Sequence, residues 1–148
     1  MGAGLRLTRR RRGLGPVLGA RELQIVGLPR KTVIVRLGKP RKQPTREWAC
    51  PFQVTGLGQR GVQHGYGEDG IQAVGNALQG IRVALDRSRT NLAWVGGEAG
   101  WTGFERSIPT SLGVAFGRKL ERLVDREISQ LVRTLERRHR ARMKRRQR

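Results

Sequence analysis

The sequence predicts an α+β protein with a three- to four-stranded antiparallel sheet packed by two helices, in the order β-β-β-α-(β)-α. Three observations predict this class. Two β-branched runs flank a Gly/Pro break, a third run alternates clearly between apolar and polar residues, and two later segments have apolar residues at helical spacing. Strands followed by helices in this order are typical of a sheet with helices on one face.

The first two strands are expected to form a β-hairpin. Glu22–Val26 is a short apolar run, and Thr32–Leu37 is rich in β-branched residues. Between them, Gly27–Arg30 is a turn signal. Arg36 interrupts the second run, which indicates that one face of this hairpin meets water.

A third strand is expected at Trp48–Gly56, after a polar, proline-bearing loop at 39–47. Pro51 has no N–H to donate to a ladder, so this strand is expected at a sheet edge or bulged at that residue. The stretch Gly56–Gly67 is rich in glycine and is interpreted as a mobile loop. Alternation along the strand gives one face to four residues: Trp48, Cys50, Phe52 and Val54.

The first helix is expected to begin at Asp69, because Asp69 and Gln72 have the spacing of a capping box. Gly75 and Gly80 weaken this helix by roughly 1 kcal/mol each relative to alanine. Gly75 borders the apolar arc and is interpreted as a point of close approach to the sheet, whereas Gly80 has no evident reason. Apolar residues at steps of three and four form the arc: Ile71, Val74, Leu78, Ile81 and Leu85, widened by Ala77 and Ala84.

The bracketed strand falls at Asn91–Val95, and the last helix runs from about Val114 into the basic tail. Its apolar stripe predicts docking up to about Leu135 and a solvated or frayed end beyond it: Leu120, Val124, Ile128, Leu131 and Leu135. The chain is therefore divided into a basic flexible extension at 1–20, a single α+β domain at 21–136, and a basic helical or disordered tail at 137–148.

The net charge is strongly positive and concentrated at the two ends. The 148 residues include 31 Lys+Arg and 11 Asp+Glu, a formal charge of +20. Residues 1–12 and 137–148 contain no acid. Such blocks repel themselves and stay solvated unless an anionic surface neutralises them. The residues assigned to polyanion binding are Arg9, Arg10, Arg11, Arg12, Arg137, Arg138, Arg140, Arg142, Lys144, Arg145, Arg146 and Arg148.

These ends predict non-specific binding to nucleic acid or another polyanion, because phosphate neutralisation releases counterions without reading sequence. An anionic lipid surface fits the same charge. Two other interpretations stay open at this point. The arginines are compositional drift in solvated termini, or the charge attracts an acidic protein to an antitoxin-like or immunity-like interaction module.

Several classes of protein are not expected. No run reaches the ~18–20 apolar residues of a membrane span, so integral membrane association is not expected. The lone Cys50 excludes a disulfide framework and fits a bacterial cytoplasmic protein. Cys50 and His64 are the residue types of a nucleophile and its base. We favour the interpretation that Cys50 is a thiol packed in the core and that His64 is solvated. Glu68 and Asp69 are interpreted as capping acids, and Trp101 is the best candidate for an exposed contact residue. We expect no enzyme activity, cofactor or metal.

Two short motifs resemble an uncharacterised bacterial family, a domain of unknown function. The motifs are W-x-C-P-F-x-[IV]-x-G, beginning at Trp48, and G-x-D-x-x-Q-A, beginning at Gly67. The resemblance covers about residues 22–130 and departs from the family at Gly70 and Glu105. The family implies no mechanism. A weaker resemblance, in topology alone, is to HicB-type antitoxin domains, which neutralise a toxin and often carry a DNA-binding segment.

Overall fold

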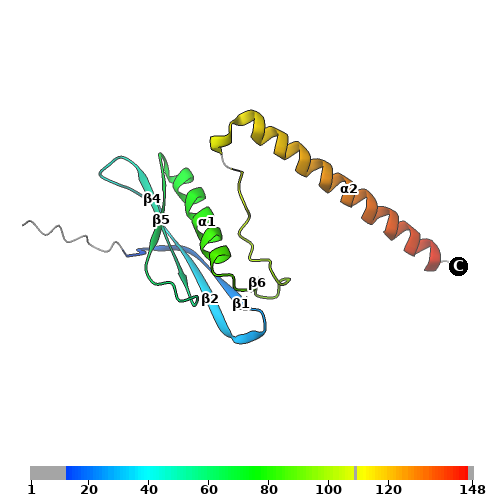
Figure 1. Cartoon of the computed structure of the whole chain (residues 1–148), viewed down its shortest axis with the longest axis horizontal. Coiled ribbons are helices and arrows are strands. Elements are labelled where there is room, and N and C mark those ends of the chain that lie inside the picture. The colour runs from blue at the N-terminus through cyan, green and yellow to red at the C-terminus, as the bar shows by residue number, and fades with distance from the viewer. Residues whose placement is uncertain (1–12, 109, 147–148) are drawn as a thin grey trace, which may run out of the picture. The chain divides into compact units, whose positions relative to one another are not determined.

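The computed structural model describes residues 13–108 and 110–146, which form two compact units with their boundary after Arg106 (Figure 1). The first unit is a sheet with one helix, and the second is a short 3₁₀ turn followed by a long helix. Each unit is described by itself below. The possible fourth strand expected at Asn91–Val95 contains the observed strand Leu92–Trp94.

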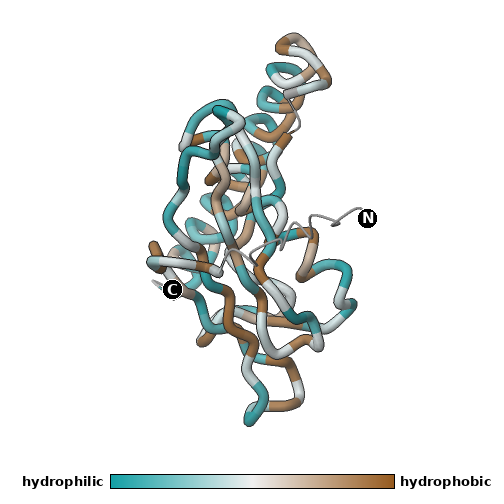
Figure 2. The backbone as a smooth tube through the Cα atoms, turned by 90° about the vertical axis from the view of Figure 1, so that its left-hand side faces the viewer, coloured by the Kyte–Doolittle hydropathy of each residue, from teal (hydrophilic) through white to brown (hydrophobic). Residues whose placement is uncertain are grey.

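The first unit is built on an antiparallel sheet, as predicted, but the sheet has six strands instead of three to four. The helix α1 (Gly70–Arg87) contacts β4 and β5 (Figure 1). Figure 2 shows hydrophobic stretches of the backbone, in brown, interspersed with hydrophilic stretches, in teal. The strands are β1 (Val17–Ile25), β2 (Leu28–Gly38), β3 (Arg41–Lys42), β4 (Trp48–Thr55), β5 (Gln63–Gly67) and β6 (Leu92–Trp94), in the order β3-β4-β2-β1-β6 with β5 paired to β4.

The two unexpected strands, β3 and β5, lie where the sequence predicted loops. β3 is a two-residue pairing inside the polar loop 39–47. β5 lies in the glycine-rich stretch that was interpreted as mobile, and that interpretation is wrong for Gln63–Gly67. β1 also begins at Val17, within the segment predicted to be a flexible extension. Residues 1–12 of that extension lie outside the described residues.

Glycine in β5 lets the helix approach the sheet closely. A Cβ on Gly65 would lie 2.1 Å from the backbone nitrogen of Ala77, and one on Gly67 would lie 2.5 Å from that of Ala73. Both alanines are fully buried. The glycines of this segment therefore admit a helix backbone, where the sequence suggested flexibility.

This close approach decides which face of α1 is buried. The alanine-rich face meets the sheet, so the predicted stripe is displaced: Ile71 is 87% exposed and Leu78 is 38% exposed. Gly75 has open space around it, so its predicted role is wrong. Gly80 is the close-approach glycine, because a Cβ there would lie 2.7 Å from Cζ of Phe52. The buried residues of α1 are Ala73, Ala77, Ile81, Ala84 and Leu85.

The amino-terminal cap of α1 is confirmed. The Asp69 carboxylate accepts a hydrogen bond from the backbone N–H of Gln72 at 2.8 Å. The Gln72 side chain accepts one in turn from the backbone N–H of Glu68 at 2.7 Å, one residue before the cap. The side chains of Asp69 and Gln72 thus each accept a hydrogen bond from a backbone N–H at the start of the helix.

β4 has the predicted alternation, but it lies inside the sheet and not at an edge. It pairs with β5 on one side and with β2 and then β3 on the other. Leu37 pairs with Phe52, and Arg41 pairs with Ala49. Between these two pairs the chain of β2 and β3 advances by four residues, whereas β4 advances by only three. Pro51 lies within this interruption, where a missing N–H costs least.

The segment after β6 is fixed to the sheet by Arg21. The guanidinium lies 4.0 Å from the ring centre of Trp94 and 4.6 Å from that of Phe104. Its Nη1 donates to the carbonyl oxygens of Gly103 at 2.6 Å and Thr102 at 3.2 Å. From α1, Arg82 donates to the carbonyl of Phe104 at 2.7 Å. This segment therefore has ordered tertiary contacts although it has no helix or strand.

The second unit consists of the turn Thr110–Leu112 and the helix α2 (Val114–Arg146). The predicted start of the last helix at about Val114 is confirmed. Within the second unit none of the residues Val114–Arg146 is buried, and the predicted docking up to about Leu135 stays a prediction. Ile128 is 55% exposed and Leu131 is 60% exposed. In the first unit α1 packs on the sheet, and in the second unit no other element buries the apolar or the basic side chains of α2.

Candidate polyanion-binding surface

The strongest concentration of charge in the described residues is the carboxy-terminal half of α2. Residues 133–146 contain eight Lys or Arg and a single acid, Glu136. The helix is 33 residues long, so it extends about 50 Å at 1.5 Å per residue. Its last turn holds three bases, which complement the partial negative charge of a helix carboxyl end: Lys144, Arg145 and Arg146.

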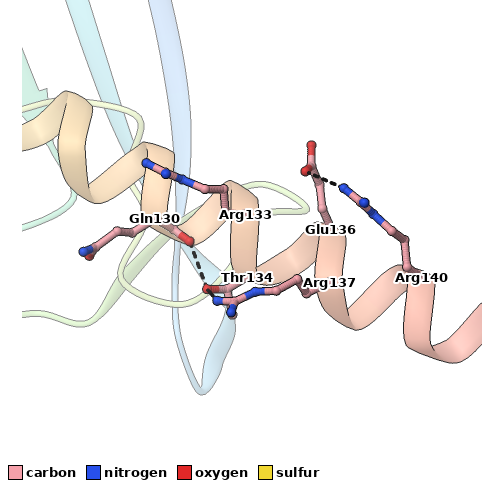
Figure 3. Close-up of a pocket in the computed structure, with 6 residues that line it drawn as sticks. All are labelled: Gln130, Arg133, Thr134, Glu136, Arg137 and Arg140. Carbon is pink, nitrogen blue, oxygen red and sulfur yellow. Dashed lines mark hydrogen bonds and ion pairs between the residues drawn. The ribbon is translucent and has the colours of Figure 1, made fainter.

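A shallow groove runs along one face of this half (Figure 3). Arg137 Nη2 donates to the hydroxyl of Thr134 at 3.4 Å, and Thr134 donates to the carbonyl of Gln130 at 2.9 Å. Arg140 forms an exposed ion pair with Glu136 at 3.4 Å. An exposed pair of this kind contributes little and is readily exchanged for another anion. The groove residues are Gln130, Arg133, Thr134, Glu136, Arg137 and Arg140.

Charge surrounds the helix after Leu135. At about 100° per residue, Arg137 and Arg140 lie on the groove face, whereas Arg138 and Arg142 lie on the opposite side. Between Arg137 and Arg146 the apolar residues are only Ala141 and Met143. This part of the helix therefore has cationic side chains over about two thirds of its circumference, and the remaining arc holds Glu136, His139 and Met143.

The predicted polyanion-binding residues fall into two groups. Seven lie on α2 and are exposed: Arg137, Arg138, Arg140, Arg142, Lys144, Arg145 and Arg146. Arg148 and the four arginines Arg9, Arg10, Arg11 and Arg12 lie outside the described residues. Arg133 was missed, although its spacing of four from Arg137 was a visible signal.

The arrangement of Cys50 and His64 does not form a thiol–imidazole pair. Cys50 pairs with Gly65 across β4 and β5, and His64 pairs with Pro51. Neighbouring residues of a strand point to opposite faces, so the two side chains lie on opposite faces of the sheet. Cys50 is fully buried in the core, and burial raises the pKa of its thiol. His64 is in β5 and stacks on Tyr66 with ring centres 5.9 Å apart, so it is not in a solvated loop as predicted.

A small apolar hollow lies between β1, β2 and α1 of the sheet unit. Its volume is about 170 Å³, below the ~300–1,000 Å³ of typical ligand pockets. Its one charged lining residue is Arg21, whose guanidinium is already bonded to Thr102 and Gly103. Trp101, the predicted contact residue, is 53% exposed and packs on Trp94 at 5.2 Å between ring centres.

In residues 13–108 and 110–146, no three His, Cys, Asp or Glu side chains gather where they would hold a metal ion. None of the described helices combines the length and apolarity needed to cross a bilayer.

A six-stranded antiparallel sheet with one packed helix, followed by a separate basic helix, defines a small α+β domain with a cationic helical extension. The chain belongs to the family described as "Domain of unknown function (DUF6968)", whose model matches residues 19–106. No curated protein and no solved structure matches the chain.

The family match confirms the predicted resemblance to a domain of unknown function, but it is shorter than the expected 22–130. It ends at Arg106, where the two compact units meet. The helix α2 thus follows the family's domain and is not part of the matched region. The resemblance to HicB-type antitoxin domains stays a prediction.

Proposed function

We propose that this chain is a non-enzymatic protein that binds nucleic acid non-specifically through the carboxy-terminal half of α2. One observation carries the proposal: residues 133–146 are helical and exposed, with eight bases on opposite sides of the helix and a single acid. Arg side chains match phosphate oxygens bidentately, and phosphate contacts supply affinity without sequence information.

The distribution of charge favours nucleic acid over a lipid surface. A membrane is a plane and contacts a helix on one side, so cationic side chains on the far side of the helix stay away from its headgroups. Residues 137–146 have no apolar face. The major groove of a duplex admits an α-helix and presents phosphates on both of its sides. Cationic side chains on two opposite sides of the helix therefore suit a groove better than a plane.

Substitutions in the full chain test this proposal. Arg133, Arg137 and Arg140 are replaced together by Gln, and a matched control replaces Arg30, Arg46 and Arg60, which are exposed bases of the sheet unit. Both triple variants lose three charges. Binding to a random-sequence DNA duplex is measured by fluorescence anisotropy over a salt series.

We expect the α2 variant to reduce the slope of log K against log salt by about 3, since each lost phosphate contact contributes about 0.9. The control should keep the wild-type slope. Equal losses in the two variants would show that net charge alone is responsible and would reject a site on α2. Salt-insensitive capture of an acidic protein, with no affinity for DNA, would favour the interaction module instead.

A further inference from the structure

The sheet of the first unit has an outer face, opposite α1, that carries two aromatic side chains. In β4, Cys50 is packed in the core against α1, so its neighbours Ala49 and Pro51 face the other way. Ala49 pairs with Tyr66 of β5, and Pro51 pairs with His64. Residues that pair across neighbouring strands share a face of the sheet. The rings of His64 and Tyr66 therefore lie on the outer face, which α1 does not cover.

Tyr66 is an exposed ring on a fixed backbone. It is 54% exposed, and it stacks on His64 with ring centres 5.9 Å apart and 30° between the ring planes. Its carbonyl oxygen accepts a hydrogen bond from the side-chain amide of Asn76, on α1, at 2.7 Å. On the other side, Tyr66 pairs with Ala49. The backbone of β5 is thus held on both sides at this residue, so a ligand that stacks on the ring finds it already positioned.

Arg41 lies in the same row of the outer face as Tyr66. It pairs with Ala49, which pairs with Tyr66 on its other side. Two strand spacings place the Cα atoms of Arg41 and Tyr66 about 10 Å apart, with only a methyl side chain between them. The guanidinium of Arg41 donates to the carbonyl oxygen of Leu14 at 3.3 Å, which uses one of its five N–H donors. An exposed cation and an exposed ring therefore flank a small residue.

The strands around this row are basic. Together, β2, β3, β4 and β5 contain five bases and no acid. The acid of β1, Glu22, lies two strands away from β4. Arg36 is also on the outer face, because it pairs with Gln53, which alternates with the core residues of β4 as Ala49 does. This part of the sheet is therefore complementary to an anion. The five bases are Arg30, Lys31, Arg36, Arg41 and Lys42.

We propose that the outer face binds single-stranded nucleic acid, with a base stacked on Tyr66 and a backbone phosphate on Arg41. Cations alone would fit any polyanion, but an exposed ring beside them calls for a ligand that also offers a flat apolar group. A single strand offers both in every nucleotide, whereas the bases of a duplex are stacked on one another and are not available to a side chain. This site is separate from the one proposed on α2, which contacts phosphates only, and does not depend on it.

Two labelled oligonucleotides of equal charge test the proposal with the full chain. One is an oligothymidylate of about 12 nucleotides, within the site sizes of single-strand binders, and the other is an abasic strand of the same length. Their affinities are measured by fluorescence anisotropy. Contacts of α2 with phosphates contribute equally to both strands, so the ratio of the two affinities reports base contacts alone. The wild type should bind the oligothymidylate about tenfold more tightly, the size of one base–aromatic stacking contact.

Substitutions of Tyr66 identify the ring that makes this contact. Tyr66→Ala and Tyr66→Leu should both abolish the preference for the strand that has bases, whereas Tyr66→Phe should keep it, because stacking needs the ring and not the hydroxyl. The matched control is Trp101→Ala, which removes another ring of similar exposure, 53%, and should leave the preference unchanged. Circular dichroism and urea titration of each variant verify that it is folded.

The phosphate contact is tested by Arg41→Gln against Arg30→Gln, which removes the same charge from the far end of β2. Arg41→Gln should weaken binding of both strands severalfold more than Arg30→Gln does. Equal affinities of the wild type for the two strands would overturn the proposal. So would a preference that survives Tyr66→Ala and Tyr66→Leu, or equal effects of the two arginine substitutions. A failure of duplex binding by α2 would leave the ratio of these affinities unchanged, so the two proposals stand or fall separately.

Discussion

The Cys50 thiol donates a hydrogen bond to the carbonyl oxygen of Gly38, with Sγ 3.3 Å from the oxygen. This contact lies where β4 changes partner from β2 to β3. Pro51, the next residue, has no N–H to offer there. The weak S–H donor thus contacts a backbone carbonyl beside the interruption of the ladder. Cys50 therefore combines core packing with a backbone contact, which explains a thiol at this position without a catalytic role.

Burial of this thiol predicts low reactivity. The pKa of Cys50 is raised by burial, so little thiolate forms near neutral pH, and the sulfur is inaccessible. We expect iodoacetamide to modify Cys50 at least about a hundredfold more slowly in the folded protein than in urea, since reaction requires opening of the core. Mass spectrometry of timed samples measures the rate. As reference, Ser129→Cys in a Cys50→Ala background places an exposed thiol on α2, and comparable rates for the two thiols would contradict a buried Cys50.

The same raised pKa predicts a loss of stability at alkaline pH. A thiol that ionises less readily in the folded state stabilises the fold below the unfolded pKa, about 8.5, and this stabilisation is lost as pH rises through the folded value. The free energy of unfolding of wild type should therefore fall relative to that of Cys50→Ala as pH rises above about 8.5. Urea titrations of both proteins at several pH values measure the difference. A constant difference from pH 7 upward would show that ionisation of Cys50 is not linked to folding.

Gly75 and Gly80 predict opposite effects of the same substitution. At Gly75 an added Cβ meets open space, so Gly75→Ala should stabilise the protein by about 0.5–1 kcal/mol through helix propensity. At Gly80 the Cβ would lie 2.7 Å from the buried Phe52 ring. Overpacking there costs about 1–3 kcal/mol and should outweigh the helical gain. Chemical denaturation of the two variants serves as a matched comparison, and stabilisation by Gly80→Ala would mean that Phe52 repacks freely.

These two glycines show how far the sequence alone predicts α1. The cap at Asp69 and the alternation of β4 depend on residues close in the chain, so local spacing predicts both correctly. The buried face of α1 depends on Gly65 and Gly67, which belong to a different element and reveal their role only once β5 is paired with β4. A local pattern cannot rank Ala73 above Ile71 as a core residue, because apolarity favours isoleucine and only the close backbone approach favours alanine.

The residues of the candidate polyanion-binding surface likewise include some that local sequence predicts and some that it does not. The basic residues after Leu135 are visible directly in the sequence, because their surface role needs no partner element. The stripe on α2 was read as a docking face for the domain, since periodicity reports that a face is apolar and not what covers it. Ile128 and Leu131 are 55% and 60% exposed, and no residue of the second unit covers them.

Arg21 should control the order of the segment that follows β6. Arg21→Lys keeps the charge but loses the planar fork that donates to Thr102 and Gly103 and lies over two aromatic rings. We expect a loss of about 1–2 kcal/mol of stability, the size of charge-assisted hydrogen bonds, and faster amide hydrogen exchange at 101–105. Arg30→Lys, at an exposed position in β2, should change neither. Unchanged exchange in the Arg21 variant would mean that other contacts hold this segment.

The basic half of α2 should gain helicity when an anion neutralises it. Arg133, Arg137 and Arg140 are three or four residues apart, and each like-charged pair at this spacing costs a few tenths of a kcal/mol, about 0.2–0.5. Sulfate or a short DNA duplex should relieve this repulsion and increase the ellipticity at 222 nm, whereas fluoride at equal ionic strength should do so less. The triple Gln variant of these arginines should start with higher helicity and respond less. Equal responses of wild type and variant would place the anion effect elsewhere in the chain and separate it from this face of α2.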